Sequence, residues 1–161
     1  MPTTQSGLYL LLGPDRYRKR QRVRAIAEAL HLNLLDRDET SAHQLTAATL
    51  MQRLRQQPIA SSRRLVILDE AHRLDRPCVE VLQACGAKQH DRNDVILLTD
   101  VEIGTTHPLR ALWTQATIER FSWLSPAEVG RWIHQQVTTA KKRIAEAAVR
   151  DVIQAFGADI A

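Results

Sequence analysis

Two adjacent carboxylates, Asp69 and Glu70, directly follow the apolar run Leu65-Val66-Ile67-Leu68. Four apolar residues followed by acidic ones predict a strand buried in a sheet, with the carboxylates at its carboxyl end. There an aspartate can bind Mg²⁺ beside a triphosphate, and a glutamate can orient the attacking water. The simpler interpretation is that both residues are polar groups that end a strand and cap the next turn.

Hydrolysis of a nucleotide would also need a loop that binds phosphate after the first strand. Such loops follow the pattern GxxxxGK[ST], whereas the chain has Gly13-Pro14-Asp15-Arg16-Tyr17-Arg18-Lys19-Arg20. The second glycine is missing, and so is a lysine followed by serine or threonine. Pro14 has no N–H to donate, and Asp15 places a negative charge where phosphate would bind. We therefore expect a degenerate nucleotide site at Gly13, Asp69 and Glu70, with no catalytic residue, metal or cofactor.

A cluster of cations follows this loop. The cluster comprises Arg16, Arg18, Lys19, Arg20, Arg22 and Arg24. On a helix, Arg16, Arg20 and Arg24 share one face at i, i+4 and i+8. This face could bind a partner subunit or the DNA backbone, or it could simply be solvated. The net charge of +4 fits a nucleic acid or an acidic protein as the partner, and it is equally compatible with a role in solubility alone.

Composition places the chain among globular proteins, since 44% of residues are hydrophobic and 25% are charged. The longest apolar runs are far too short to span a bilayer, which takes roughly 20 residues. The N-terminus lacks the pattern of a secretory signal, so we expect a cytoplasmic protein. Cys78 and Cys85 are too far apart on one helix for a disulfide. Their spacing from His72 and His90 does not indicate a zinc site.

Short apolar runs alternate with helical patterns over the first 124 residues. We expect strands at 8–12, 32–35, 65–68, 95–99 and 117–123, and helices at 16–30, 41–57, 75–87 and 108–113. This alternation predicts an α/β fold with a parallel sheet covered by helices on both faces. Beyond the boundary only helical patterns occur, at 125–140 and 144–156. We therefore predict an α/β domain over 1–124 and the first helices of a small helical domain over 125–161.

Several segments of the chain match one family, in order and at the right intervals. They are Tyr9–Asp15, Pro58-Ile59-Ala60-Ser61-Ser62-Arg63-Arg64-Leu65-Val66, Leu124–Ile133, Ile144–Ala148 and Phe156–Asp159. Together they span nearly the whole chain, which resembles the delta subunit of the bacterial DNA polymerase III clamp loader. Asp69-Glu70-Ala71-His72 is more similar to the related delta-prime and ATPase subunits, but the zinc module of the first and the phosphate loop of the second are absent.

The resemblance implies a P-loop-NTPase-like (AAA+) fold that does not bind ATP. It also implies a role in DNA replication, as a subunit of the polymerase III holoenzyme that helps to open the sliding clamp without activity of its own. The implied partners are the beta clamp, the tau/gamma and delta-prime subunits and, indirectly, primed DNA. No membrane is implied. The family continues beyond the point where this chain ends, so we expect a fragment or a short form.

In the family, a hydrophobic pair after a proline inserts into the clamp, which assigns clamp binding here to Ile59 and Ala60, with Leu54 and Gln57 beside them. The family usually has phenylalanine at the second position of the pair. Replacing a buried phenylalanine by alanine typically costs about 3–5 kcal/mol, so we expect clamp binding to be weaker, to use another residue such as Leu54, or to be lost.

Two other functions remain open from the sequence. The first is a small Mg²⁺-dependent NTPase or helicase-like protein that uses Asp69 and Glu70. The second is a basic domain that binds nucleic acid through Arg16, Arg20 and Arg24, with an affinity that falls steeply with salt.

Overall fold

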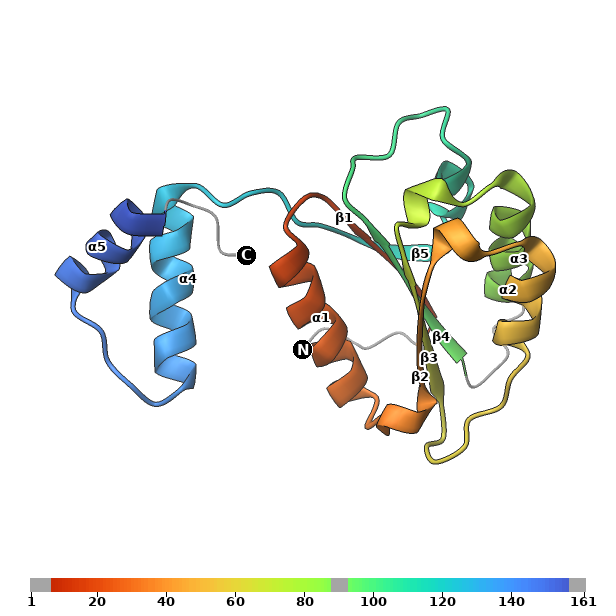
Figure 1. Cartoon of the computed structure of the whole chain (residues 1–161), viewed down its shortest axis with the longest axis horizontal. Helices are drawn as coiled ribbons and strands as arrows, with labels where there is room; N and C mark the ends of the chain where they lie inside the picture. Colours follow the sequence, from red (N-terminus) through yellow and green to blue (C-terminus); the bar gives the residue numbers. More distant parts are fainter. Residues whose placement is uncertain (1–6, 88–92, 157–161) are drawn as a thin grey trace. The chain divides into compact units, whose positions relative to one another are not determined.

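The computed structural model describes residues 7–87 and 93–156. The chain divides after Phe121 into two compact units. The first unit is built on a parallel sheet, and the second contains two helices (Figure 1). The predicted boundary near residue 124 lies close to this division. No helix within the described ranges is long and apolar enough to cross a membrane.

The sheet has five strands in the order β2-β3-β4-β1-β5, and every neighbouring pair is parallel. The strands are β1 (Leu8–Leu12), β2 (Arg37–Ser41), β3 (Arg64–Asp69), β4 (Asn93–Thr99) and β5 (Ala116–Arg120). The central strands β3, β4 and β1 are almost entirely buried. This burial explains why they are continuous apolar runs rather than alternating ones.

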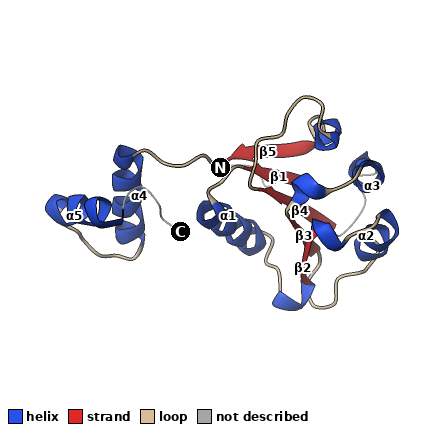
Figure 2. Cartoon of the chain, turned by 45° about the horizontal axis from the view of Figure 1, so that its top comes forward, coloured by secondary structure: helices blue, strands red, loops and turns tan. Residues whose placement is uncertain are grey.

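Helices of the first unit cover both faces of the sheet, and the last two α-helices belong to the second unit. The α-helices are α1 (Arg16–Ala29), α2 (Ala47–Leu54), α3 (Arg76–Ala87), α4 (Pro126–Thr139) and α5 (Glu146–Phe156). The short 3₁₀ helices are η1 (Leu34–Asp36), η2 (Ala42–Gln44), η3 (Ala71–Arg73) and η4 (Pro108–Leu112). Helix α1 lies on one face, and α2 and α3 lie on the other (Figure 2).

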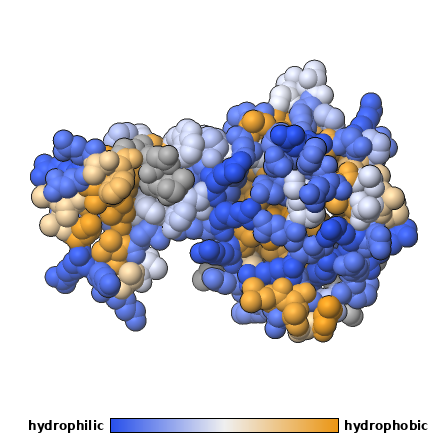
Figure 3. Space-filling view, in the orientation of Figure 1, coloured by the Kyte–Doolittle hydropathy of each residue, from blue (hydrophilic) through white to orange (hydrophobic). Residues whose placement is uncertain are grey.

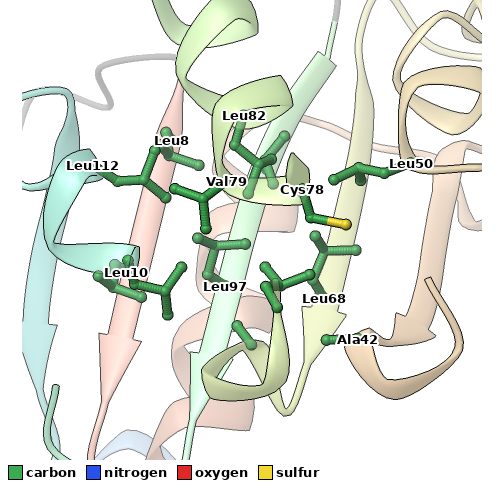
Figure 4. Packing of buried hydrophobic residues seen from close by; sticks show 14 of the residues in the cluster. Leu8, Leu10, Ala42, Leu50, Leu68, Cys78, Val79, Leu82, Leu97 and Leu112 are labelled. Atoms are coloured by element: carbon green, nitrogen blue, oxygen red, sulfur yellow. The ribbon is translucent and has the colours of Figure 1, made fainter. Parts of the chain in front are cut away.

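Alternate residues of each strand feed two separate cores, as the pleat of a strand requires. Leu8, Leu10 and Leu12 of β1 point to the side of α2 and α3, where they join the larger cluster shown in Figure 4. Tyr9 and Leu11 point to the opposite side, where they belong to the cluster that includes the apolar residues of α1. The sheet is therefore held by apolar packing on both faces.

Two predicted elements are wrong in position. Residues 32–35 form no strand: η1 begins at Leu34, and the strand is the polar segment Arg37–Ser41. Because β2 lies at the edge of the sheet, its side chains are only partly buried and need not be apolar. The helix expected from 41 instead begins at Ala47, after Thr46 caps it together with Thr49.

The remaining differences are at element ends. Strand β5 ends at Arg120 rather than at residue 123, although the Phe121 N–H still donates to the carbonyl of Leu12. Helix α4 begins with a capping box formed by Ser125 and Glu128. Helix α5 begins at Glu146 rather than at residue 144, and the part of the matched segment beyond Phe156 lies outside the described residues.

Candidate functional site

The backbone N–H groups of the loop after β1 donate hydrogen bonds to other residues of the protein. Gly13 adopts a φ of +116°, and its N–H donates to the carbonyl of Thr99 at 3.1 Å. Pro14 has no N–H, and the N–H of Asp15 donates to the carbonyl of Phe121 at 3.1 Å. None of the three residues between β1 and α1 therefore offers an N–H to a phosphate group.

The N-terminus of α1 is also occupied by a group of the chain. Asp15 is buried, and its carboxylate caps the helix by accepting the N–H of Arg18 at 3.0 Å. A helix N-terminus attracts anions, and here the anion is Asp15 itself. Because α1 begins at Arg16, the loop is also shorter than the motif GxxxxGK[ST] requires.

Lys19 fills the position beside the carboxyl ends of β1 and β4. Its side chain is only 2% exposed. Its Nζ donates to the carbonyl of Thr99 at 2.6 Å and to Oδ1 of Asp100 at 2.8 Å. In open parallel sheets, ligands bind outside the carboxyl ends of the strands, where the chain connections diverge to the two sides. The ammonium group of Lys19 therefore occupies the region in which a phosphate would be expected.

Sequence reasoning did not single out Lys19, although there was a signal. Counted from Gly13 as the first position, Lys19 stands where the motif GxxxxGK[ST] has its lysine. Arg16 binds the same carboxylate as Lys19, at Oδ2 of Asp100. Burial alone would raise the pKa of Asp100, but hydrogen bonds from Arg16 and Lys19 outweigh it and hold that pKa below its ordinary value.

The structure places Asp69 and Glu70 at the carboxyl ends of the strands, as it does Gly13, but both carboxylates already accept hydrogen bonds from residues of the chain. Oδ2 of Asp69 accepts from Nη2 of Arg20 at 3.0 Å. Glu70 adopts a left-handed φ of +52°, and its Oε2 accepts from the hydroxyl of Ser41 at 2.8 Å. This hydrogen bond, opposed by burial, lowers the pKa of Glu70. The predicted degenerate site is thus a set of internal polar contacts.

The predicted basic face of α1 is largely neutralised by acidic residues in or directly after the strands of the sheet. Arg16 pairs with Asp100, and Arg20 pairs with Glu39 as well as with Asp69. Arg24 is exposed. The three residues do lie on one helix, as expected, but two of the three charges are directed to partners within the chain.

The loop Pro58–Ser62 presents the predicted clamp-binding pair. The side chain of Ile59 is 80% exposed, and Ala60 and Gln57 are exposed as well. Leu54 differs from the expectation: it is the last residue of α2 and is buried in the larger core, so its side chain does not reach this surface. The loop is therefore an exposed apolar projection formed mainly by Ile59.

A buried carboxylate that the sequence analysis missed holds this loop in place. Asp36, at the end of η1, is fully buried. Its carboxylate accepts the backbone N–H groups of Ile59, Ala60 and Ser61, at distances of 2.5 to 2.9 Å. The hydroxyl of Ser61 accepts the N–H of Asn33 at 2.7 Å. Asp36 and Ser61 together join the loop to the turn at 33–36.

These contacts predict how acid affects the protein. The hydrogen bond from the Ile59 N–H, with those from Ala60 and Ser61, lowers the pKa of Asp36. A lowered pKa in the folded state stabilises the fold above the unfolded value, about 3.9, and this stabilisation is lost as the pH falls through the folded value. We expect Asp36→Asn to unfold at lower urea than wild type between about pH 5 and 8, with the difference shrinking below about pH 4. A difference that persists or grows in acid would contradict this role.

Comparison with known proteins supports the fold. The sequence matches no protein-family model and no curated protein. The structure is similar to the Bacillus subtilis DNA clamp loader delta protein YqeN, with a TM-score of 0.70 and 16% identity over 91% of this chain and 47% of that one. It is also similar to the Thermotoga maritima RuvB Holliday junction branch migration motor, with a TM-score of 0.56 and 21% identity over 89% of this chain and 47% of that one.

A third similar structure is the DNA polymerase III gamma subunit-related protein from Thermotoga maritima, with a TM-score of 0.54 and 14% identity over 83% of this chain and 46% of that one. This chain spans about half the length of each of these structures. The α/β part of the predicted fold class is confirmed: the chain has an all-parallel sheet covered by helices, and this fold is similar to those of the clamp-loader delta and RuvB structures.

Proposed function

We propose that this chain is a clamp-loader subunit of the delta kind, which binds and helps to open a sliding clamp without hydrolysing ATP itself. The observation that carries the proposal is the exposed side chain of Ile59 on a loop whose backbone is bound by the buried Asp36. The similarity of the fold to a clamp loader delta protein supports it. The other loader subunits and, through them, primed DNA are the further partners of such a role.

The geometry of the loop suits an anchor. An apolar side chain that enters a pocket on a partner contributes binding energy because it is removed from water. That energy is reduced if the loop must first become ordered. The hydrogen bonds from three consecutive N–H groups to Asp36 order the backbone in advance. Ile59 therefore meets a partner from a fixed position.

The degenerate nucleotide site supports the second part of the proposal. The N–H groups of Gly13 and Asp15 and the ammonium group of Lys19 are all bound to acceptors of the chain. A triphosphate would have to displace these contacts and approach the carboxylate of Asp15. This arrangement favours a subunit that acts by contact within the polymerase III holoenzyme, where other subunits hydrolyse ATP.

Replacing Ile59 with aspartate tests the clamp contact. A charge on the anchor cannot enter an apolar pocket, so we expect the affinity for the sliding clamp of the same organism to fall by roughly 30-fold or more. Surface plasmon resonance on the full chain gives this affinity. Val101→Asp is the matched control, because Val101 is also exposed and apolar. It follows the carboxyl end of β4, whereas Ile59 precedes the amino end of β3. Clamp binding by Ile59→Asp at the level of the control would refute the proposal.

A further inference from the structure

Two more exposed leucines lie beside the Ile59 loop. Leu34 and Leu35 of η1 are 76% and 67% exposed. The residue that follows them is Asp36, which binds the N–H of Ile59, and the residue before them is Asn33, which binds Ser61. Figure 3 shows apolar side chains gathered at the bottom of the first unit, where Figure 1 places η1 and the 58–62 loop. We refer to Leu34, Leu35 and Ile59 as the three-residue apolar patch.

The leucines are not needed to form the turn that carries them. The side chain of Asn33 accepts the N–H of Leu35 at 3.0 Å, and the carbonyl of Asn33 accepts the N–H of Asp36 at 3.1 Å. Hydrogen bonds of Asn33 and Asp36 thus hold the backbone of η1. The leucine side chains are exposed to water, which is unfavourable for apolar groups. Single exposed apolar residues are ordinary, but a contiguous group of large ones marks a binding surface.

Most of the charged residues around the patch are arginines. The segments 31–37 and 55–63 contain Arg37, Arg55 and Arg63 and a single acidic residue, Asp36. Arg63 is paired with the buried Asp94. Asp36 is buried, and its charge is directed to three N–H groups, whereas Arg55 is exposed. Arg37 and Arg55 therefore make the border of the patch basic, which complements an apolar pocket bordered by carboxylates.

We propose that Leu34 and Leu35 insert into the same partner as Ile59, so that the three-residue apolar patch binds an apolar pocket with an acidic border on the sliding clamp. The inference rests on the proposed function and extends it to a second segment of the chain. It also accounts for Ala60, which is too small to be a second anchor in the loop: the leucines of η1 supply the apolar contact that the loop lacks.

The test compares clamp binding by the full chain with that of two variants and a control. Leu34→Ser combined with Leu35→Ser should weaken binding by roughly tenfold, and Ile59→Ser should weaken it by a similar factor. Val101→Ser, which lies beyond the carboxyl ends of the strands and away from the patch, should bind as wild type does. All four residues are exposed, and circular dichroism checks that the variants fold. Raising the salt concentration should slow association, because the basic border steers the encounter.

Each other outcome overturns the inference in a recognisable way. If wild type binds the clamp and only Ile59→Ser weakens it, the proposed function stands and the role of the leucines is wrong. If wild type does not bind the clamp, both fall. Flotation with phosphatidylglycerol–phosphatidylethanolamine vesicles and sedimentation velocity complete the comparison. A leucine-dependent attachment to vesicles, or a leucine-dependent dimer, with clamp binding unchanged would assign the patch to a lipid surface or a second copy instead.

Discussion

Replacing Lys19 with methionine is expected to lower the free energy of unfolding by about 3 kcal/mol, although the variant keeps most of the side-chain volume. The change leaves the buried carbonyl of Thr99 without the Nζ donor at 2.6 Å. It also removes the partner of Asp100 at 2.8 Å, so that this carboxylate is held by Arg16 alone. Urea denaturation measures the difference.

Arg24→Met is the matched control for this change. Arg24 lies on the same helix, α1, but its side chain is exposed, so its replacement should change stability by less than about 0.5 kcal/mol. Equal stabilities of the two variants would show that the contacts of Lys19 with Thr99 and Asp100 do not stabilise the fold. MgATP adds a second check: a rise in the melting temperature of wild type would mean that nucleotide displaces the Lys19 contacts, against the proposed function.

Replacing Gly13 with alanine is expected to destabilise the protein by about 2–4 kcal/mol. A Cβ at this position would lie 2.5 Å from the carbonyl oxygen of Phe121 and 2.8 Å from its carbon, and both are backbone atoms. The φ of +116° adds strain, because residues with a Cβ rarely adopt it. The loop would have to move away from the end of β5, which would break the hydrogen bonds of Gly13 and Asp15.

Gly104→Ala provides the comparison for Gly13→Ala. A Cβ at Gly104 meets no atom within 4 Å, so we expect little change in its thermal unfolding. If Gly13→Ala and Gly104→Ala melt at the same temperature, the loop after β1 is not held against β5 as described.

The core of the fold could be predicted because its strands carry a strong signal. β1, β3 and β4 are buried on both faces, so their residues are apolar in succession. β2 carries no such signal, because an edge strand needs no apolar side chains. Its Asp38 instead accepts hydrogen bonds from Arg53 and Arg64, residues that follow it in the chain by 15 and 26 positions. No local pattern indicates such a pairing.

The candidate site likewise contains residues that a sequence pattern indicates and residues that only the folded structure reveals. Ile59 could be assigned by resemblance, since it stands in a recognisable segment after Pro58. Asp36 could not, and for Lys19 the sequence offered only its position in the motif GxxxxGK[ST], because each acts on residues distant in the sequence. Asp36 binds N–H groups 23 to 25 residues away, and Lys19 binds a carbonyl 80 residues away. Isolated polar residues of this kind are interpretable only when the folded chain brings their partners to them.

The strand order has a consequence for how the protein is made. β1 is synthesised first, yet its two neighbours are β4 and β5, so that Leu8 pairs with Val95 and with Ala116. In a nascent chain, β1 cannot have both of its neighbours until residue 120 has left the ribosome. Contacts between distant segments slow folding, and unpaired strand edges invite aggregation. We therefore expect β1, with its five apolar residues, to be the segment that chaperones protect during translation.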